Sequence, residues 1–181
     1  MKTFARRTRR LFHTVMFPKQ LAFGVFFLKL FGDKNYCKQL KIKLLQCPNN
    51  TVGHEMLCFL TTNGFELVPY YEKHDMKHVL LGYGTSATEE MYMQAFMFGN
   101  AGFQPIGTLI FLSFLVWTPY ILSELPYHFL IGRFTKPVGG LRVEDLAHCN
   151  LLELRQEIGL KEAIWRADLV FGNLKPVQAV H

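Results

Sequence analysis

A long stretch without charged side chains, residues 91–123, constrains the fold more than any other feature of the sequence. Such a stretch has to be buried, either in a protein core or in a membrane. Glycines and prolines interrupt it, and its densest apolar part, residues 108–117, is about ten residues long, whereas a spanning helix needs about 20. We therefore expect a central core helix. A hydrophobic groove for a lipid tail would use the same composition, because phenylalanines and methionines can enclose a flexible chain.

The other segments favour helices, and none shows the alternation of a strand. Residues 36–63 have a helical pattern in two pieces, which are separated at Cys47–Pro48. Apolar residues at helical spacing predict a further helix from 143 to 158 and a short one from 161 to 169. We find no internal repeat. The sequence therefore predicts a single compact all-α domain over residues 33–181, with a hydrophobic groove.

Residues 1–32 are basic and rich in phenylalanine, and they contain no acidic residue. Residues 1–43 hold eleven Lys or Arg and one acid, whereas the remainder holds nine and thirteen. This distribution favours an anionic membrane surface over nucleic acid as a partner. We expect an interfacial segment whose Arg and Lys contact head groups, with packing of its phenylalanines on the domain as the alternative. A twin-arginine-like run at residues 8–12 lacks a cleavage site, and the apolar residues 21–28 are too few to span a membrane.

The four cysteines are widely separated and form no C-x-x-C pair. We interpret them as reduced thiols in a cytoplasmic compartment. Together with the basic first segment, this predicts a cytoplasmic protein that associates peripherally with the inner face of a membrane. In a eukaryote the corresponding location would be the matrix side of the mitochondrial membrane.

Two histidines, His74 and His78, lie four residues apart and carry the clearest chemical signal. If residues 69–81 form a helix, the two rings stand one above the other, and Asp75 points into the same sector. Two nitrogens and a carboxylate on one face suit a divalent ion such as zinc. Two alternatives remain open. Asp75 could instead orient a histidine by accepting its ring N–H, or it could pair with a lysine on a solvated face.

A glycine turn connects this helix to a fourth candidate ligand, Glu90. The turn Gly82-Tyr83-Gly84 ends the first helix, since glycine readily adopts the left-handed conformation of a C-cap. Ser86 and Glu89 form a capping box for the next helix, which leaves Glu90 free. A short turn between antiparallel helices would bring Glu90 over the two histidines. The sequence therefore predicts metal ligands at His74, Asp75, His78 and Glu90.

The spacing of this motif resembles that of a known family. HDMKH, eleven residues and then Glu match H-D-x-x-H-x11-E, the signature of the coenzyme Q biosynthesis protein four family. Upstream, NNTVGHEMLCFLTTNGFE is similar to the Gly-Thr-Leu-Gly…Phe-Leu…Asn-Gly segment of that family. Downstream, LLELRQEIGL is similar to its closing Leu-x-x-Leu-Arg-x-Glu-Leu-Gly helix. The resemblance covers about residues 48–160, and the chain departs from it in its basic aromatic start and in the Phe- and Met-rich sequence after Glu90.

The resemblance implies an all-α peripheral membrane protein of ubiquinone biosynthesis. Members of the family hold a divalent metal, commonly zinc, and a polyprenylated quinone precursor. They are linked to organising other biosynthetic enzymes and to oxidative decarboxylation at ring C1. For this chain the expected partners are therefore an isoprenoid quinone precursor or another prenyl lipid and other quinone-biosynthesis enzymes, with a homo-oligomer also open. The motif positions carried over are His74, Asp75, His78 and Glu90.

Two functions follow from this resemblance. In the first, the chain is a metal-dependent decarboxylase of a prenylated aromatic acid, in which the metal polarises a carboxylate or phenolate. Whichever of Asp75 and Glu90 is not a ligand could then carry a proton. No flavin or haem motif is present, so dioxygen or a partner enzyme would supply the oxidant. In the second, the chain is a non-catalytic lipid-binding scaffold with a structural metal.

Two other enzyme classes fit the sequence less well. The His-Asp dipeptide suggests an HD-type phosphohydrolase, but that class needs further ligands, and His54 and Asp145 lack the expected local pattern. A membrane di-iron hydroxylase needs several histidine boxes, whereas the remaining histidines of this chain are scattered singly.

Overall fold

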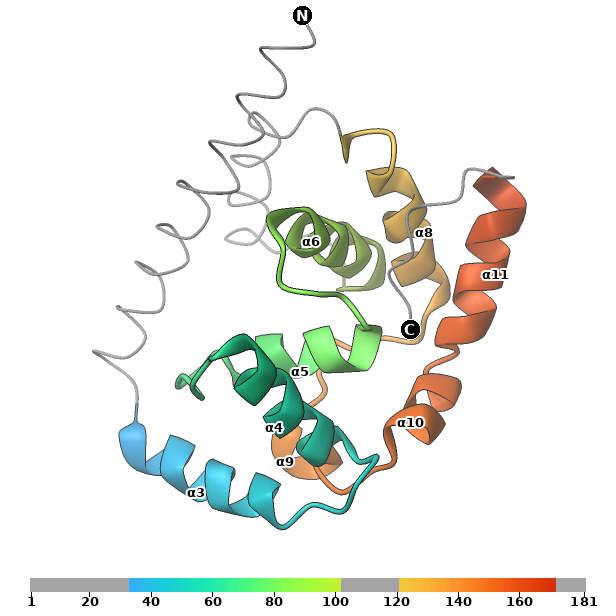
Figure 1. Cartoon of the computed structure of the whole chain (residues 1–181). Helices are drawn as coiled ribbons and strands as arrows, with labels where there is room; N and C mark the ends of the chain where they lie inside the picture. The colour runs from blue at the N-terminus through green and yellow to red at the C-terminus, as the bar shows by residue number, and fades with distance from the viewer. Residues whose placement is uncertain (1–32, 102–120, 172–181) are drawn as a thin grey trace, which may run out of the picture.

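The computed structural model of the chain describes residues 33–101 and 121–171 (Figure 1). Apart from one isolated bridge between Thr51 and Asn150, no strand occurs in these ranges, which confirms the predicted all-α fold. The predictions for residues 1–32 and for most of the uncharged stretch lie outside the described residues. The helices are α3 (Lys34–Leu45), α4 (Val52–Asn63), α5 (Glu72–Leu81), α6 (Ala87–Ala101), α8 (Leu125–Phe134), α9 (Val143–Leu146), α10 (Leu151–Glu157) and α11 (Leu160–Phe171).

The predicted break near Cys47–Pro48 lies between α3 and α4 and has a local chemical cause. The side chain of Thr51 accepts a hydrogen bond from the backbone N–H of His54 and so caps the start of α4. At the other end, Gly64 adopts the left-handed conformation with φ 66°. Helix α4 therefore begins and ends at residues whose chemistry is visible in the sequence.

Two predicted helices differ from the structure. The helix expected over residues 69–81 begins at Glu72, because Tyr70 has φ 66° and this left-handed conformation interrupts a helix. The helix expected over residues 143–158 is divided into α9 and α10. Asn150 separates them, since its side chain accepts from the N–H groups of Leu152 and Glu153 and starts a new helix.

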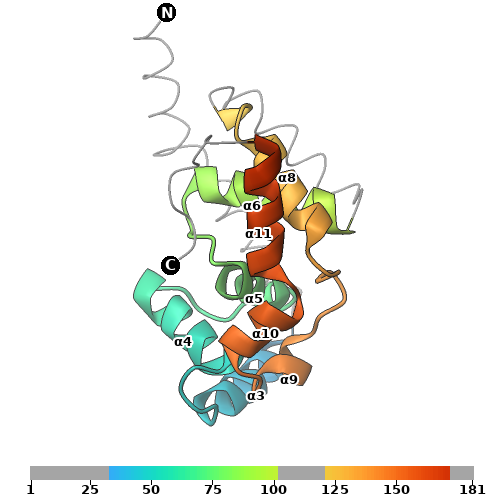
Figure 2. The same cartoon turned by 90° about the vertical axis from the view of Figure 1, so that its right-hand side faces the viewer.

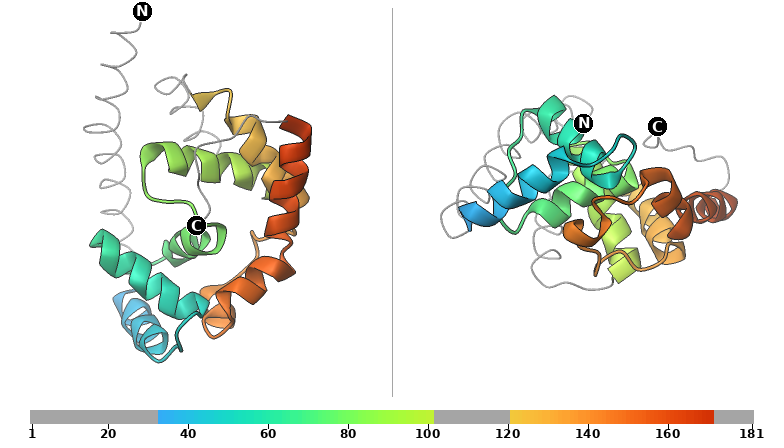
Figure 3. Two further views of the ribbon diagram at one scale, coloured as in Figure 1. Left: turned by 45° about the vertical axis from the view of Figure 1, so that its right-hand side comes forward. Right: turned by 90° about the horizontal axis from the view of Figure 1, so that it is seen from below.

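Helix α5 lies in the middle of the molecule, between α4 and α6 (Figures 1 and 3). It contacts α4, α9 and α10, while α3 packs on α4 from outside. Helix α8 packs along α6, and α11 packs along α8, as the turned view shows (Figure 2). Segments from both halves of the chain therefore surround α5.

The described part of the uncharged stretch, residues 91–101, is the body of α6 and belongs to the core. Met91, Met93 and Phe96 have at most 1% of their surface exposed. This agrees with the expectation of a core helix for that part. No helix among the described residues has the length and apolar character needed to cross a membrane.

A cavity of about 520 Å³ opens between α3, α4 and the segment that follows α4. Its apolar lining includes Leu57, Leu60 and Leu67, and the exposed Lys38 and Lys41 also contribute. None of its lining residues belongs to residues 91–101, the described part of the stretch along which the hydrophobic groove was expected. A groove along that stretch would involve residues 102–120, which are outside the described ranges.

Candidate metal centre

Helix α5 carries His74 and His78 one turn apart, with their ring centroids 4.7 Å from each other. The chain then turns into α6, whose first turn holds Glu90. At this turn Ser86 Oγ donates to Glu89 Oε2 over 2.7 Å, and the other oxygen of Glu89 accepts from a backbone N–H. Glu89 is thus occupied at the start of α6, which leaves Glu90 to face the histidines, as the sequence predicted.

Both imidazoles direct a nitrogen at the Glu90 carboxylate. Nε2 of His78 lies 3.0 Å from Oε1 of Glu90, and Nε2 of His74 lies 3.3 Å from Oε2. One donor atom from each of the three residues falls within 4.8 Å of the others. Their side chains are 2%, 19% and 12% exposed for His78, His74 and Glu90, so the group is largely shielded from water.

The fourth predicted ligand, Asp75, is not part of this group of three. Its Oδ1 lies 3.9 Å from Nδ1 of His74, on the ring edge away from Glu90. That distance is too long for a hydrogen bond, and Nδ1 of His74 is buried without a partner. Asp75 thus lies beside the ring of His74 without the hydrogen bond that an orienting role requires, and both its role as a direct ligand and its orienting role stay predictions.

Two aromatic rings and a backbone carbonyl fix the orientation of the histidines. The ring of Phe59 stacks on His78 with centroids 5.3 Å apart, and Tyr71 stacks on His74 at 4.2 Å. The carbonyl oxygen of Tyr83 lies 3.1 Å from Nδ1 of His78. Because a carbonyl only accepts, Nδ1 must carry the proton of this hydrogen bond.

The charges of the group reinforce one another. Burial alone would lower the pKa of His74, but the carboxylates of Asp75 and Glu90 outweigh it and raise the pKa to about 9. Burial alone would raise the pKa of Glu90, but His74 and His78 outweigh it and lower the pKa to about 2. In the metal-free protein at neutral pH, His74 is therefore an imidazolium that faces a carboxylate.

The donor set fits a divalent metal. Nε2 of His78 and Nε2 of His74 both point at the carboxylate of Glu90, so a cation between the three residues would be held by two nitrogens and one carboxylate. Two imidazole nitrogens and one carboxylate form the three-ligand set of many zinc sites, in which a further position remains open. The residues thus suit the metal that the sequence predicted.

The sequence interpretation missed the residues that support the ligands. Phe59 lies in α4 and Tyr71 directly precedes α5, and neither belongs to a motif of its own. Tyr83 acts through its backbone carbonyl, which any residue at that position would supply. Among the described residues no second group of three ligands gathers, so His54 and Asp145, which a phosphohydrolase would need, lie outside the metal centre.

Comparisons with known proteins indicate the fold. No protein-family model matches the chain, and no curated protein matches it. The chain is similar to the crystal structure of a "putative ubiquinone biosynthesis protein" from Nostoc punctiforme, with 22% sequence identity and a TM-score of 0.53. The match covers 84% of this chain and 85% of that one. At this level of identity the likeness shows a shared fold alone.

Proposed function

We propose that the chain is a peripheral membrane protein that binds a divalent metal, with zinc as the preferred ion. We further propose that it acts on or presents a polyprenylated quinone precursor. The convergence of His74, His78 and Glu90 is the observation that carries the proposal. The motif resemblance at these residues and the fold shared with the Nostoc protein support the same function. Oxidative decarboxylation at ring C1 is the reaction that we propose for an enzymatic role.

Each residue of the centre has a defined task in this proposal. His74, His78 and Glu90 would hold the ion, and a bound divalent ion would act as a Lewis acid towards a carboxylate or phenolate. Asp75 would fix the ring of His74, or move a proton if Glu90 and both histidines are the ligands. Phe59 and Tyr71 exclude water from the two rings. An aromatic head group would bind at the open side of the metal.

The isoprenoid tail would follow the uncharged stretch, residues 91–123, and residues 1–32 would bind an anionic bilayer. The buried methionines of α6 support an apolar environment next to Glu90. Dioxygen or a partner enzyme would accept the electrons of the oxidative step. With these assignments, we propose that the protein associates peripherally with the inner face of a membrane.

The second candidate function is a non-catalytic scaffold that organises other quinone-biosynthesis enzymes around a bound lipid. The observation in its favour is that the ligands join α5 to α6, so that a metal would link two elements of the fold. A structural metal stabilises the protein outright. The two functions differ in product formation, while both require the metal.

Metal analysis of two variants tests the centre. His78→Ala removes a ligand while alanine keeps the helix, so we expect no zinc above background and an unchanged far-ultraviolet circular dichroism spectrum. Asp75→Asn should keep zinc but bind it about 10- to 100-fold more weakly if Asp75 only orients His74. Stoichiometric zinc in the His78→Ala protein would contradict the centre.

Native mass spectrometry with elemental analysis, on protein extracted gently with its lipids, tests the substrate. One zinc per chain together with a prenylated aromatic acid supports the proposal, and release of labelled carbon dioxide from that acid would then identify the enzyme. Zinc with the lipid but without turnover supports the scaffold. Zinc without any prenyl lipid would overturn the proposed substrate.

A further inference from the structure

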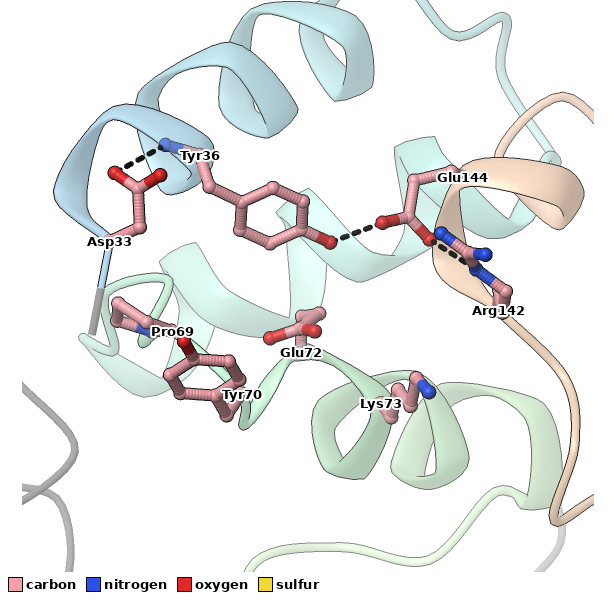
Figure 4. Close-up of a pocket in the computed structure, with 8 residues that line it drawn as sticks. All are labelled: Asp33, Tyr36, Pro69, Tyr70, Glu72, Lys73, Arg142 and Glu144. Carbon is pink, nitrogen blue, oxygen red and sulfur yellow. Dashed lines mark hydrogen bonds and ion pairs between the residues drawn. The ribbon is translucent and has the colours of Figure 1, made fainter. Parts of the chain in front are cut away.

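A second polar pocket lies on the side of α5 away from the metal centre. It has a volume of about 400 Å³, within the usual range for small-molecule sites. Its lining comes from the start of α3, the start of α5 and the segment around α9 (Figure 4). Glu72 and His74 are two residues apart, which places them about 200° from each other around α5. The pocket and the metal centre therefore use opposite faces of one helix.

Glu72 has a buried carboxylate oxygen in this pocket that lacks a hydrogen-bond partner. Only 6% of its surface is exposed, and its Oε2 atom is buried without a hydrogen bond. In Figure 4 its carboxylate lies in the middle of the lining side chains. A buried carboxylate oxygen without a donor is costly, so native proteins usually pair it with a protein group, a water or a ligand. This oxygen therefore indicates a missing donor in the pocket.

Three of the neighbouring polar residues, Tyr36, Asp33 and Glu144, already have partners of their own. The hydroxyl of Tyr36 donates to Glu144, and the other oxygen of Glu144 lies 3.6 Å from Nε of Arg142. Asp33 caps α3 by accepting from two backbone N–H groups. None of these three residues donates a hydrogen bond to Oε2 of Glu72.

The arrangement of charges selects the chemical class of the ligand. The pocket contains three carboxylates, from Asp33, Glu72 and Glu144, but they do not gather closely enough to form a metal group. An organic ammonium is a charged donor that matches a buried carboxylate. The ring of Tyr70, which is 70% exposed, and the ring of Tyr36 also line the pocket, and aromatic rings attract ammonium groups.

Two exposed cations complete the lining, Lys73 and Arg142. They would repel a ligand that carries only positive charge, and the carboxylates would repel one that carries only negative charge. We propose that the pocket binds a small zwitterion, whose primary ammonium group pairs with Glu72 while its anionic group faces Lys73 and Arg142. Phosphoethanolamine has this chemistry, both as a free molecule and as the head group of a phospholipid.

The number of N–H donors on the ligand gives a direct test on the unaltered full-length chain. Phosphoethanolamine has three, whereas phosphocholine has the same two charges but none. We expect saturable binding of phosphoethanolamine, followed by shifts of the Tyr36 and Tyr70 ring resonances in nuclear magnetic resonance spectra. Phosphocholine, ethanolamine and inorganic phosphate should each bind at least tenfold more weakly. Equal binding of phosphocholine, or no saturable binding, would overturn the proposal.

A pair of isosteric variants locates the site. Glu72→Gln should weaken phosphoethanolamine binding at least tenfold, because it removes the charge and keeps the volume. Glu157→Gln makes the same chemical change on the exposed face of α10 and should leave binding unaltered. Undiminished binding by Glu72→Gln would contradict the assignment, and if that variant does not fold, the ligand series on the unaltered chain still decides. Zinc content should be the same in both variants, so the outcome is independent of the metal centre.

Vesicles distinguish the two sources of the ligand. If the lipid head group is the ligand, phosphatidylethanolamine vesicles should bind the chain more tightly than phosphatidylcholine vesicles, and Glu72→Gln should abolish the difference. If the free molecule is the ligand, both vesicles should bind equally, and soluble phosphoethanolamine should still shift the tyrosine resonances. If the Glu72→Gln variant still binds phosphatidylethanolamine vesicles more tightly than phosphatidylcholine vesicles, the lipid head group is not the ligand of this pocket.

Discussion

At the scale of single residues, Glu90 determines the electrostatics of the metal centre. Its two oxygens lie 3.0 Å from His78 and 3.3 Å from His74, each towards Nε2. The same nitrogens would have to bind a metal, so the ion and the protons compete for them. The raised pKa of His74 therefore affects metal affinity as well as folding.

Zinc binding should release at least one proton at neutral pH. His74 has a pKa of about 9 in the metal-free protein, and only the neutral ring binds a metal. Between pH 6 and pH 8 the zinc association constant should rise about tenfold per pH unit, because one proton has to leave for each ion bound. Isothermal titration calorimetry in buffers of different ionisation enthalpy measures this proton number. A binding heat that is the same in all buffers would contradict it.

The same pair of groups sets the stability of the metal-free protein. Because the pKa of His74 is raised above its unfolded value of about 6.5, its contribution is complete below that pH and is lost as the pH rises through about 9. Because the pKa of Glu90 is lowered to about 2, its contribution is present above about 4.5 and is lost as the pH falls towards 2. Both contributions to the stability of the metal-free protein are therefore complete between about pH 4.5 and pH 6.5.

His128 should make the fold sensitive to mild acid. It is 3% exposed, its Nδ1 lies 2.9 Å from the hydroxyl of Tyr83, and burial lowers its pKa to about 4. Between pH 6.5 and pH 4 the unfolded chain binds a proton here that the native protein does not, so stability falls as the pH falls. From pH 7 to pH 5 this amounts to about 2 kcal/mol.

Urea unfolding of His128→Gln at pH 7 and pH 5 checks this effect. Glutamine can still bond to the hydroxyl of Tyr83 but does not titrate, so the variant should lose about 2 kcal/mol less than the unaltered chain between the two pH values. Equal losses in both proteins would show that His128 is not responsible.

At the scale of elements, the contact between α6 and α8 depends on two glycines. A Cβ atom on Gly99 would lie 1.9 Å from the carbonyl oxygen of Phe129, and one on Gly132 would lie 2.0 Å from that of Phe96. Both obstacles are backbone atoms, which cannot rotate away. The two helices would have to separate, although alanine is the better helix former.

Gly99→Ala and Gly132→Ala should each destabilise the protein by about 1–3 kcal/mol, the usual cost of inserting a group into a close-packed contact. Gly140→Ala is the matched control, since an added Cβ there meets nothing within 4 Å. Thermal unfolding should show a lower midpoint for the first two and an unchanged one for the third. A Gly132→Ala protein as stable as the control would refute the contact.

Helix ends were predictable where one residue type determines them. Gly82 ends α5 with φ 75°, and Ser86 with Glu89 starts α6, both as expected from local chemistry. The later start of α5 and the division at Asn150 were not predicted. The left-handed conformation of Tyr70 has no signal in the sequence, because tyrosine rarely adopts it. Asn150 caps α10 with its side chain, and apolar periodicity alone does not reveal such a cap.

At the scale of the whole molecule, the convergence of His74, His78 and Glu90 was predictable because these residues lie within one helix–turn–helix unit. Spacing alone places His74 over His78, and the glycine turn brings Glu90 back to them. The displacement of Asp75 to the far edge of His74 required knowledge of side-chain positions. The pocket around Glu72 could not have been predicted, since α3, α5 and the α9 segment meet only in the folded chain.

Arg155 joins the two halves of the molecule, and its removal should destabilise the whole fold. Its Nε and Nη2 atoms donate to the carbonyl oxygens of Leu80 and Val79, at 3.0 and 2.9 Å, where α5 ends. The last carbonyl groups of a helix have no partner within the helix, and a cation at this end also interacts favourably with the helix dipole. Arg155→Met, which keeps most of the volume, should therefore lower the free energy of unfolding by about 2 kcal/mol.

Two further variants distinguish the effect of the Arg155 hydrogen bonds from the general effect of removing a positive charge. Arg155→Lys should recover only part of the loss, because one ammonium group cannot reproduce the planar fork of a guanidinium. Arg166→Met removes an exposed arginine that pairs with Glu162 on the surface of α11, and it should change stability by less than about 1 kcal/mol. Urea midpoints measure all three variants. If Arg155→Met and Arg166→Met unfold at the same urea concentration, the link from α10 to α5 contributes nothing specific to the fold.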